Sequence, residues 1–287
     1  MNITAQMVKE LRDITGAGMM DAKKALVETD GDMEKAQEVL RQKGMASADK
    51  KMGRIAAEGL VASFVDDSCG AMIELNCETD FVAKNAEFKE LANMLAEGVA
   101  KSNPSDVDAF LATTCPKCGK AISEVIKEKI ASIGEKITFR RFVREVGNTA
   151  TYIHNGKIGV LLVTDKKDDE LMKDVCLHIT SSAPQFISRA DVPQSVIDEE
   201  TRIEMGKEDL QKKPEAIRAK IVEGRVAKLM SQRCLLEQPF VKNPDITVGQ
   251  LIEGKMNIKS FTRFVLGEGL EKRQDNFAEE VMSQIKG

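Results

Sequence analysis

Residues 60–77, LVASFVDDSCGAMIELNC, decide the fold of the first half of this 287-residue chain. Side-chain type changes with the two-residue period of a β-strand over Leu60–Val65 and again over Met72–Cys77. The intervening segment, Asp66–Gly70, is rich in residues that favour turns. The stretch therefore predicts a β-hairpin.

A helix is predicted directly after this hairpin, over residues 86–101. Its apolar residues recur at helical spacing and bury one face on the sheet: Phe88, Leu91, Leu95 and Val99. The same order of elements returns later, because residues 150–154 and 158–163 flank the turn pair Asn155-Gly156, and a helix is predicted over residues 169–182. This repetition of strand, turn, strand and helix indicates an internal duplication, although the two halves share little sequence identity.

The residues before the first hairpin predict a small bundle of three helices. Thr4 is placed to cap the first helix, which Gly16-Ala17-Gly18 ends. A second helix is predicted over residues 19–28, and a third before Gly44. The residues predicted to pack these helices together are Val8, Leu11 and Ile14 in the first and Met33, Ala36, Val39 and Leu40 in the third. A bundle of this size buries little surface, so it leaves apolar side chains available to a partner.

Two antiparallel helices are predicted between Pro193 and Cys234. The first is highly charged and runs to Lys213, and Pro214 interrupts the helical pattern. The second carries an apolar seam of Ile217, Ile221, Val222, Val226, Leu229 and Met230. Narrow apolar seams with charged outer faces predict a coiled-coil-like arm that projects from the core. A final helix is predicted over residues 275–285.

Together these patterns predict an α+β fold. It comprises an N-terminal three-helix bundle, a duplicated core of antiparallel β-sheets with packed helices, an inserted antiparallel helical hairpin and a C-terminal helix. The predicted divisions are residues 1–54 for the N-terminal domain, 55–146 for the first half of the core, 147–187 with 234–267 for its second half, 188–233 for the arm and 268–287 for a C-terminal helical module.

Composition argues against a nucleic-acid-binding or membrane-spanning chain. Lys and Arg number 42 against 46 Asp and Glu, so the formal net charge is −4 and attraction to phosphate backbones is weak. With no Trp and one Tyr, few rings are available to stack on bases. The longest apolar run, residues 160–163, is far shorter than the ~20 residues of a membrane-spanning helix. Since the N-terminus lacks a secretory pattern, we expect a cytoplasmic protein with no direct nucleic-acid or membrane partner.

Enzyme motifs find little support in the sequence, and we expect no catalytic residue, cofactor or bound metal. None of the Gly-Lys pairs is followed by Ser or Thr, so the phosphate-binding P-loop is absent. His154 and His178 are the only histidines, and neither lies in a His-Glu-x-x-His zinc pattern. Both are more typical of hydrogen-bonded structural or contact residues.

Cys115-Pro116-Lys117-Cys118 has the spacing of half a zinc ribbon or of a thiol redox motif. No second pair follows it, and the motif precedes a charged helix instead of lying in a βαβ unit. The favoured interpretation is therefore a plain exposed loop or first helical turn, with reduced thiols. A thiol or metal enzyme built on Cys115 and Cys118 is the alternative, and it predicts bound zinc or a labile thiolate.

Residues 79–85, Thr-Asp-Phe-Val-Ala-Lys-Asn, closely resemble a signature of the bacterial elongation factor Ts family. Residues 11–26, LRDITGAGMMDAKKAL, resemble the N-terminal domain of the same family, and Arg263-Phe264 with Gly267-Glu268-Gly269 resemble the edge of its core. Three motifs in the family's order are far more specific than one short pattern. The resemblance implies a noncatalytic factor that exchanges guanine nucleotide on elongation factor Tu in translation elongation, binding the GDP and nucleotide-free forms of that partner.

The resemblance also implies a fold and a set of contact residues. The N-terminal domain is expected to be similar to ubiquitin-associated three-helix modules, followed by the duplicated core, the arm and the C-terminal module. The implied contacts with elongation factor Tu are Asp80 and Phe81, framed by Thr79 and Val82, for dislodging Mg²⁺; Arg12, Met19, Met20 and Lys23 in the N-terminal domain; and His154 in the second half of the core. The arm offers a surface through which the complex could dimerise. Lys242 departs from relatives in which an apolar contact residue can occur.

Phe81 has a physical role that is intelligible without the family. An aromatic side chain at a strand-to-helix corner is held rigidly and can be presented outward as a wedge. If it enters a pocket near the magnesium site of the partner, it displaces the groups that hold the ion, and GDP then leaves faster. Two alternatives stay open: Phe81 packs into the core while Asp80 caps the next helix, or the protein is an interaction scaffold without exchange activity.

Overall fold

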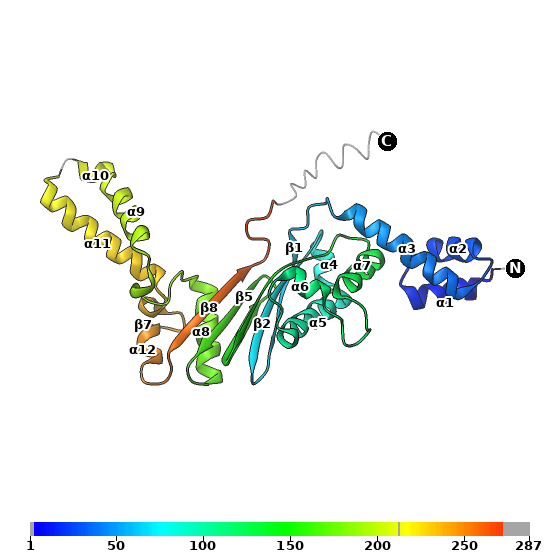
Figure 1. Ribbon diagram of the computed structural model, residues 1–287. Helices are drawn as coiled ribbons and strands as arrows, with labels where there is room; N and C mark the ends of the chain where they lie inside the picture. Colours follow the sequence, from blue (N-terminus) through cyan, green and yellow to red (C-terminus); the bar gives the residue numbers. More distant parts are fainter. Residues whose placement is uncertain (1–2, 212, 272–287) are drawn as a thin grey trace. The chain divides into compact units, whose positions relative to one another are not determined.

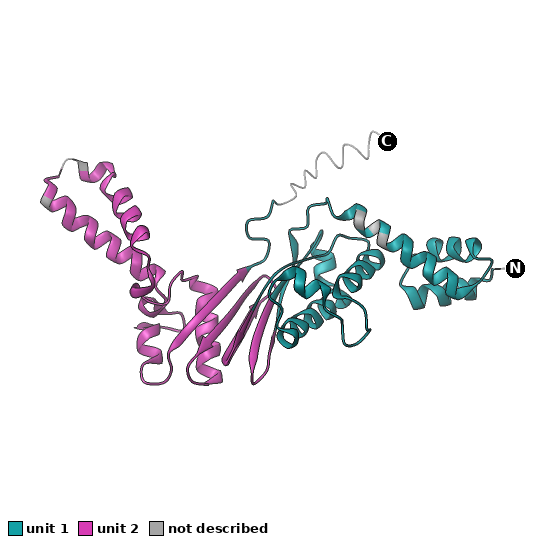
Figure 2. Ribbon diagram, viewed as in Figure 1, with its two compact units in different colours: residues 1–63, 73–143, 265–287 teal, residues 64–72, 144–264 magenta. Residues whose placement is uncertain are grey.

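The computed structural model describes residues 3–211 and 213–271. Over this range the fold is mixed α+β, with N-terminal helices and three small antiparallel sheets whose strand orders are β1-β2-β3, β4-β5-β8 and β6-β7 (Figure 1). The described residues form two compact units. Unit 1 takes its residues from 1–63, 73–143 and 265–287, and unit 2 from 64–72 and 144–264 (Figure 2). The predicted fold class is confirmed at this level.

Three helices form the N-terminal part of unit 1: α1 (Ala5–Thr15), α2 (Met19–Glu28) and α3 (Met33–Lys51). The hydroxyl of Thr4 accepts a hydrogen bond from the Met7 backbone N–H at 3.2 Å, as the cap prediction requires. Gly16 ends α1 with a φ of +67°, a conformation that favours glycine. The residues buried between the helices are Val8, Leu11, Ala22, Ala25, Leu26 and Ala36. Ile14, predicted on the same face, is 56% exposed instead.

Helix α3 continues past Gly44 to Lys51, so the prediction that the third helix lies before this glycine is wrong. The reason is its packing against α7 (Ile122–Ile133). A Cβ at Gly44 would lie 2.8 Å from the Cβ of Ala131, so glycine lets the two helices approach closely. Arg41 also forms ion pairs with Glu124 and Glu128 of α7, at 3.2 and 3.6 Å.

The first hairpin and its helix are confirmed. Strands β1 (Glu58–Val65) and β2 (Cys69–Cys77) lead through α4 (Asp80–Lys84) to α5 (Ala86–Ser102), which buries Phe88, Leu91, Leu95 and Val99 as predicted. Sequence analysis missed α6 (Val107–Ala112) and β3 (Thr138–Val146). Strand β3 was not predicted because its centre carries Arg140 and Arg141, which interrupt the apolar pattern.

Unit 2 contains the second predicted hairpin, with β4 (Asn148–His154), β5 (Ile158–Thr164) and the covering helix α8 (Asp169–Ser182). The strands are antiparallel, with Tyr152 opposite Val160. Strand β8 (Ile258–Val265), which was not predicted, completes this sheet. Shorter elements close the unit: the 3₁₀ helices Arg189–Asp191 and Leu235–Glu237, β6 (Pro239–Phe240), β7 (Asn243–Thr247) and α12 (Val248–Ile252).

The arm consists of α9 (Gln194–Met205), α10 (Glu208–Gln211) and α11 (Glu215–Arg233). Its first helix ends at Met205, so the prediction that it runs to Lys213 is wrong. The turn at Gly206 redirects the chain and lets Leu210 bury itself completely among residues of α11. Arg225 of α11 holds this turn through ion pairs with Glu204 and Asp209, at 3.4 and 2.5 Å. The helix predicted at 275–285 lies outside the described residues.

Candidate functional site

The segment that carries Asp80 and Phe81 is a corner between strand β2 and two successive helices. Helix α4 has only five residues and no fully buried side chain, so packing alone holds it weakly. The Thr79 hydroxyl caps its start by accepting from the Val82 backbone N–H at 3.3 Å. Asn85 ends α4 and caps α5, since its side chain accepts from the Glu87 N–H at 2.8 Å. The corner is therefore fixed by caps at both ends.

Phe81 points away from the protein core. Its side chain is 81% exposed, the highest value among the large hydrophobic residues described as exposed. The alternative in which Phe81 packs into the core is therefore wrong, and Thr79 takes the capping role that the same alternative gave to Asp80. Asp80 instead pairs with Lys84 at 2.6 Å, and the Lys84 ammonium lies 6.0 Å from the centre of the Phe81 ring. An exposed ring of this size leaves a large apolar area for a partner.

Glu135 anchors the corner from a loop more than 50 residues away in the sequence. One of its carboxylate oxygens accepts from the backbone N–H groups of Glu78 and Thr79, at 3.1 and 3.0 Å. The other accepts from the Thr79 hydroxyl at 2.6 Å. Charged acceptors make the stronger class of hydrogen bond, so Glu135 holds the residue that caps α4. Sequence reasoning missed this residue, because no local pattern links it to Thr79.

Glu78 ties the same corner to the linker that precedes β1. Its carboxylate pairs with Arg54 at 3.2 Å and accepts from the Lys136 backbone N–H at 2.6 Å. The Lys136 side chain in turn donates to the Arg54 carbonyl oxygen at 2.9 Å. Residues 135–136 thus bind both the corner and the linker.

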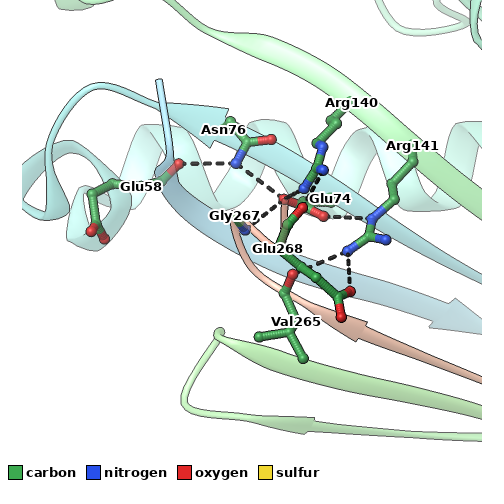
Figure 3. A network of polar contacts seen from close by, with 8 residues as sticks. All are labelled: Glu58, Glu74, Asn76, Arg140, Arg141, Val265, Gly267 and Glu268. Atoms are coloured by element: carbon green, nitrogen blue, oxygen red, sulfur yellow. Dashed lines mark hydrogen bonds and ion pairs between the residues drawn. The ribbon is translucent and has the colours of Figure 1, made fainter. Parts of the chain in front are cut away.

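A buried ionic cluster fixes the chain where it leaves β8 (Figure 3). Glu74 of β2 is fully buried and binds the guanidinium groups of Arg140 and Arg141 at 2.9 and 2.6 Å. The same carboxylate accepts from the Gly267 backbone N–H at 2.8 Å, while Arg141 donates to the Val265 carbonyl oxygen at 3.0 Å. Burial opposes ionisation of Glu74, but the hydrogen bonds from Gly267 and both arginines outweigh it and lower its pKa.

The four N-terminal residues named by the resemblance all lie on the surface of the helix bundle: Arg12 on α1 and Met19, Met20 and Lys23 on α2. Met19 and Met20 are 47% and 63% exposed. Val27, one turn beyond Lys23, is 57% exposed and lies two turns from Met20 on the same face of α2. Sequence reasoning did not single out Val27, although its helical spacing from Met20 was a usable signal.

A family model described as Elongation factor TS matches residues 78–268, which is more than half of the chain. The chain belongs to the elongation factor Ts family. It is a noncatalytic nucleotide exchange factor for elongation factor Tu, and it acts in translation elongation. The matched range includes residues 79–85 of the corner and also Arg140, Arg141 and Gly267, which bind Glu74.

The two histidines differ in environment. His154 is exposed at the end of β4, where Tyr152 and Asn155 approach its ring nitrogens at 3.3 Å. His178 on α8 is fully buried. Its Nδ1 accepts from the Val241 backbone N–H at 3.2 Å, and its Nε2 lies 2.9 Å from the Gln238 side-chain oxygen. Burial lowers the pKa of His178, although the hydrogen bond to Gln238 acts in the opposite direction.

Residues 3–211 and 213–271 meet the requirements of neither a metal site nor a membrane-spanning helix. No group of three or more His, Cys, Asp or Glu residues in this range is arranged to hold a metal ion. None of the helices in the part of the chain that the structure describes is long and apolar enough to cross a membrane.

Proposed function

We propose that the exchange activity depends on Phe81, which acts as a wedge against elongation factor Tu. The observation that carries the proposal is an 81% exposed phenylalanine on a helix that is fixed by caps and by Glu135. A rigid, exposed aromatic ring loses little conformational entropy when a partner buries it. Thr79 and Val82 frame the wedge, because their hydrogen bond forms the first turn of α4.

The wedge acts on the magnesium ion of the partner. We propose that Phe81 enters a hydrophobic pocket near this ion and displaces the groups that hold it. Loss of Mg²⁺ removes the charge that binds the β-phosphate of GDP, so the nucleotide leaves faster. Asp80 brings a carboxylate to the same region and perturbs its electrostatics. No bond is made or broken in this step, and no ionisable group of the factor has to change its charge.

The N-terminal bundle supplies a second contact with elongation factor Tu. Arg12, Met19, Met20 and Lys23 are proposed to bind the partner, and their exposure supports this role. The exposed methionines of α2 provide buried area on binding, while the two cations provide electrostatic steering. His154 is proposed as a contact of the second half of the core, since it is exposed at a strand end.

The finer architecture is proposed along the same lines. We infer a ubiquitin-associated-like bundle over residues 1–54, duplicated core halves at 55–146 and at 147–187 with 234–267, an arm at 188–233 and a C-terminal module at 268–287. The recurring order of two strands followed by helix supports the duplication. The arm is proposed as the surface for any dimer of the complex, and the cytoplasm as the site of action.

The test is the release of a fluorescent GDP analogue from magnesium-loaded elongation factor Tu, with the factor present in substoichiometric amount. We expect the variant Phe81→Ala to lower exchange efficiency by about 30-fold or more. This factor corresponds to the ~2 kcal/mol of binding free energy that is typical of an aromatic hot spot. Asp80→Ala should also slow release. Val146→Ala is the matched control, because Val146 is another exposed apolar residue, at 63%.

Two outcomes would count against the wedge. If Phe81→Ala exchanges nucleotide as fast as wild type, exchange does not depend on this side chain. If wild type binds elongation factor Tu without accelerating release, the protein is an interaction scaffold for that partner.

A further inference from the structure

The Cys115–Cys118 motif lies in a tight loop between α6 and α7. Thr114 and Ala121 form an isolated antiparallel bridge at its base, and the Cys115 backbone N–H donates to the Lys120 carbonyl oxygen at 2.8 Å. The chain reverses at Gly119, which has a φ of +69° and donates to the Cys115 carbonyl oxygen at 2.9 Å. The Cys118 backbone N–H also donates to the Cys115 carbonyl oxygen at 3.4 Å, so the two cysteines stand at the two ends of one β-turn.

The two sulfur atoms have different environments. Cys115 is 1% exposed and lies 3.8 Å from the sulfur of Met94, whereas Cys118 is exposed to solvent. Burial alone would raise the pKa of the Cys115 thiol, but hydrogen bonds from the Cys118 side chain and from the backbone N–H groups of Lys117 and Cys118 outweigh it and lower that pKa. By contrast, burial raises the pKa of Cys77 and Cys176 to about 12.

We infer that Cys115 and Cys118 form a redox-active dithiol that reacts with small disulfides of the glutathione class. The Cys118 thiolate attacks one sulfur of the oxidised disulfide, forms a mixed disulfide and releases one thiol. The Cys115 thiolate then attacks the Cys118 sulfur and releases the second thiol. Two electrons and two protons pass from the cysteine pair to the small disulfide, which is reduced to two thiols. The reaction reverses when reduced thiol is in excess.

The division of roles follows from the exposure of the two residues. Only Cys118 presents its sulfur to solvent, so it meets the incoming disulfide. Cys115 is shielded from that disulfide but stands at the other end of the same turn as Cys118, so it closes the ring and limits the lifetime of the mixed disulfide. The inference uses none of the residues proposed for exchange, and its test is independent of elongation factor Tu.

A structural zinc ion is the competing occupant of such a pair. Structural zinc takes four protein ligands, and this loop supplies two. Among the residues that the structure describes, no third His, Cys, Asp or Glu joins them in a metal-binding arrangement. The observations therefore favour the dithiol.

The experiment equilibrates the full-length protein with mixtures of reduced and oxidised glutathione, blocks remaining thiols with an alkylating agent and identifies the products by peptide mass spectrometry. We expect wild type to form the Cys115–Cys118 disulfide without accumulating a glutathione adduct. Cys115→Ala should lose the disulfide and accumulate glutathione on Cys118. Cys118→Ser should leave Cys115 reduced, because the remaining sulfur is buried. Cys77 and Cys176 serve as internal controls that stay reduced in the folded protein.

Three results would overturn the inference. The pair could stay reduced in oxidised glutathione alone, or wild type could accumulate the mixed disulfide as Cys115→Ala does. Purified wild type could also retain a stoichiometric zinc ion through dialysis and lose it in Cys118→Ser. Circular dichroism of each variant verifies that the fold is intact.

Discussion

Glu135 illustrates how a single residue controls the proposed site without belonging to it. Its carboxylate accepts three hydrogen bonds from Glu78 and Thr79, and Thr79 in turn caps the helix that carries Phe81. Because α4 has no fully buried side chain, these polar contacts add to its limited packing. The position of Phe81 therefore depends on a residue that need not touch the partner.

Replacing Glu135 with alanine should slow exchange. The variant loses hydrogen bonds to a charged acceptor, which contribute about 1.5–3 kcal/mol each in favourable cases, and α4 loses its fixed position. We expect slower release of the fluorescent GDP analogue at saturating factor. Thr79→Ser is the control, since serine keeps the hydroxyl that binds Glu135 and caps α4. Unchanged release by Glu135→Ala would show that the corner is held without this residue.

His178 predicts a pH dependence of stability. Its pKa is lowered in the folded protein below the ordinary value of 6.5, so the unfolded chain takes up the proton first as the pH falls. The contribution of neutral His178 to the free energy of unfolding is therefore fully present above pH 6.5. It is lost as the pH falls from 6.5 through the pKa of His178 in the folded protein. Urea unfolding across this range should give a smaller pH dependence for His178→Gln than for wild type. Equal slopes would contradict the assignment.

At the scale of elements, the packing of α3 on α7 depends on Gly44. A methyl group there would lie 2.8 Å from the Cβ of Ala131, closer than carbon atoms normally approach. Gly44→Ala should therefore destabilise the protein by about 1–3 kcal/mol, although alanine is the better helix former.

Gly224 in α11 offers a matched control for that prediction. A Cβ at this position meets no atom within 4 Å, so Gly224→Ala should stabilise the protein by about 0.5–1 kcal/mol. The measurement is the free energy of unfolding of both variants in urea. Equal effects of the two substitutions would show that α3 and α7 do not pack as closely as described.

Sequence patterns predicted the elements whose interactions are local. Both hairpins, α5 and α8 follow from residue period and turn residues within short windows. Strand β3 did not, because Arg140 and Arg141 are paired with Glu74, a residue more than 60 positions away. The end of α9 at Met205 was missed for a related reason, since the burial of Leu210 against α11 decides it.

The residues of the candidate site also separate into those that a local motif predicts and those that only the folded structure reveals. Residues 79–82 were found from one continuous motif, and the exposure of Phe81 agrees with the wedge interpretation. Glu135 could not be found, because its relation to Thr79 exists only after the chain folds. Val27 could have been predicted from the sequence, since it lies on the exposed face of α2.

At the scale of the whole molecule, exchange is a coupling between two ligands of elongation factor Tu. Whatever weakens GDP when the factor is bound must equally weaken the factor when GDP is bound. The factor therefore supplies no energy and sets no direction. An excess of GTP over GDP therefore sets the direction of exchange.

The most direct test of the wedge combines the Phe81 variant with removal of magnesium. The release rate of the fluorescent GDP analogue from elongation factor Tu is measured with wild type and with Phe81→Ala, first in Mg²⁺ and then in excess chelator. If Phe81 acts by displacing the ion, wild type exceeds the variant by a wide margin in Mg²⁺, and the margin shrinks markedly in chelator. An equal margin under both conditions would contradict the account, because Phe81 would then act on GDP by a route that does not involve magnesium.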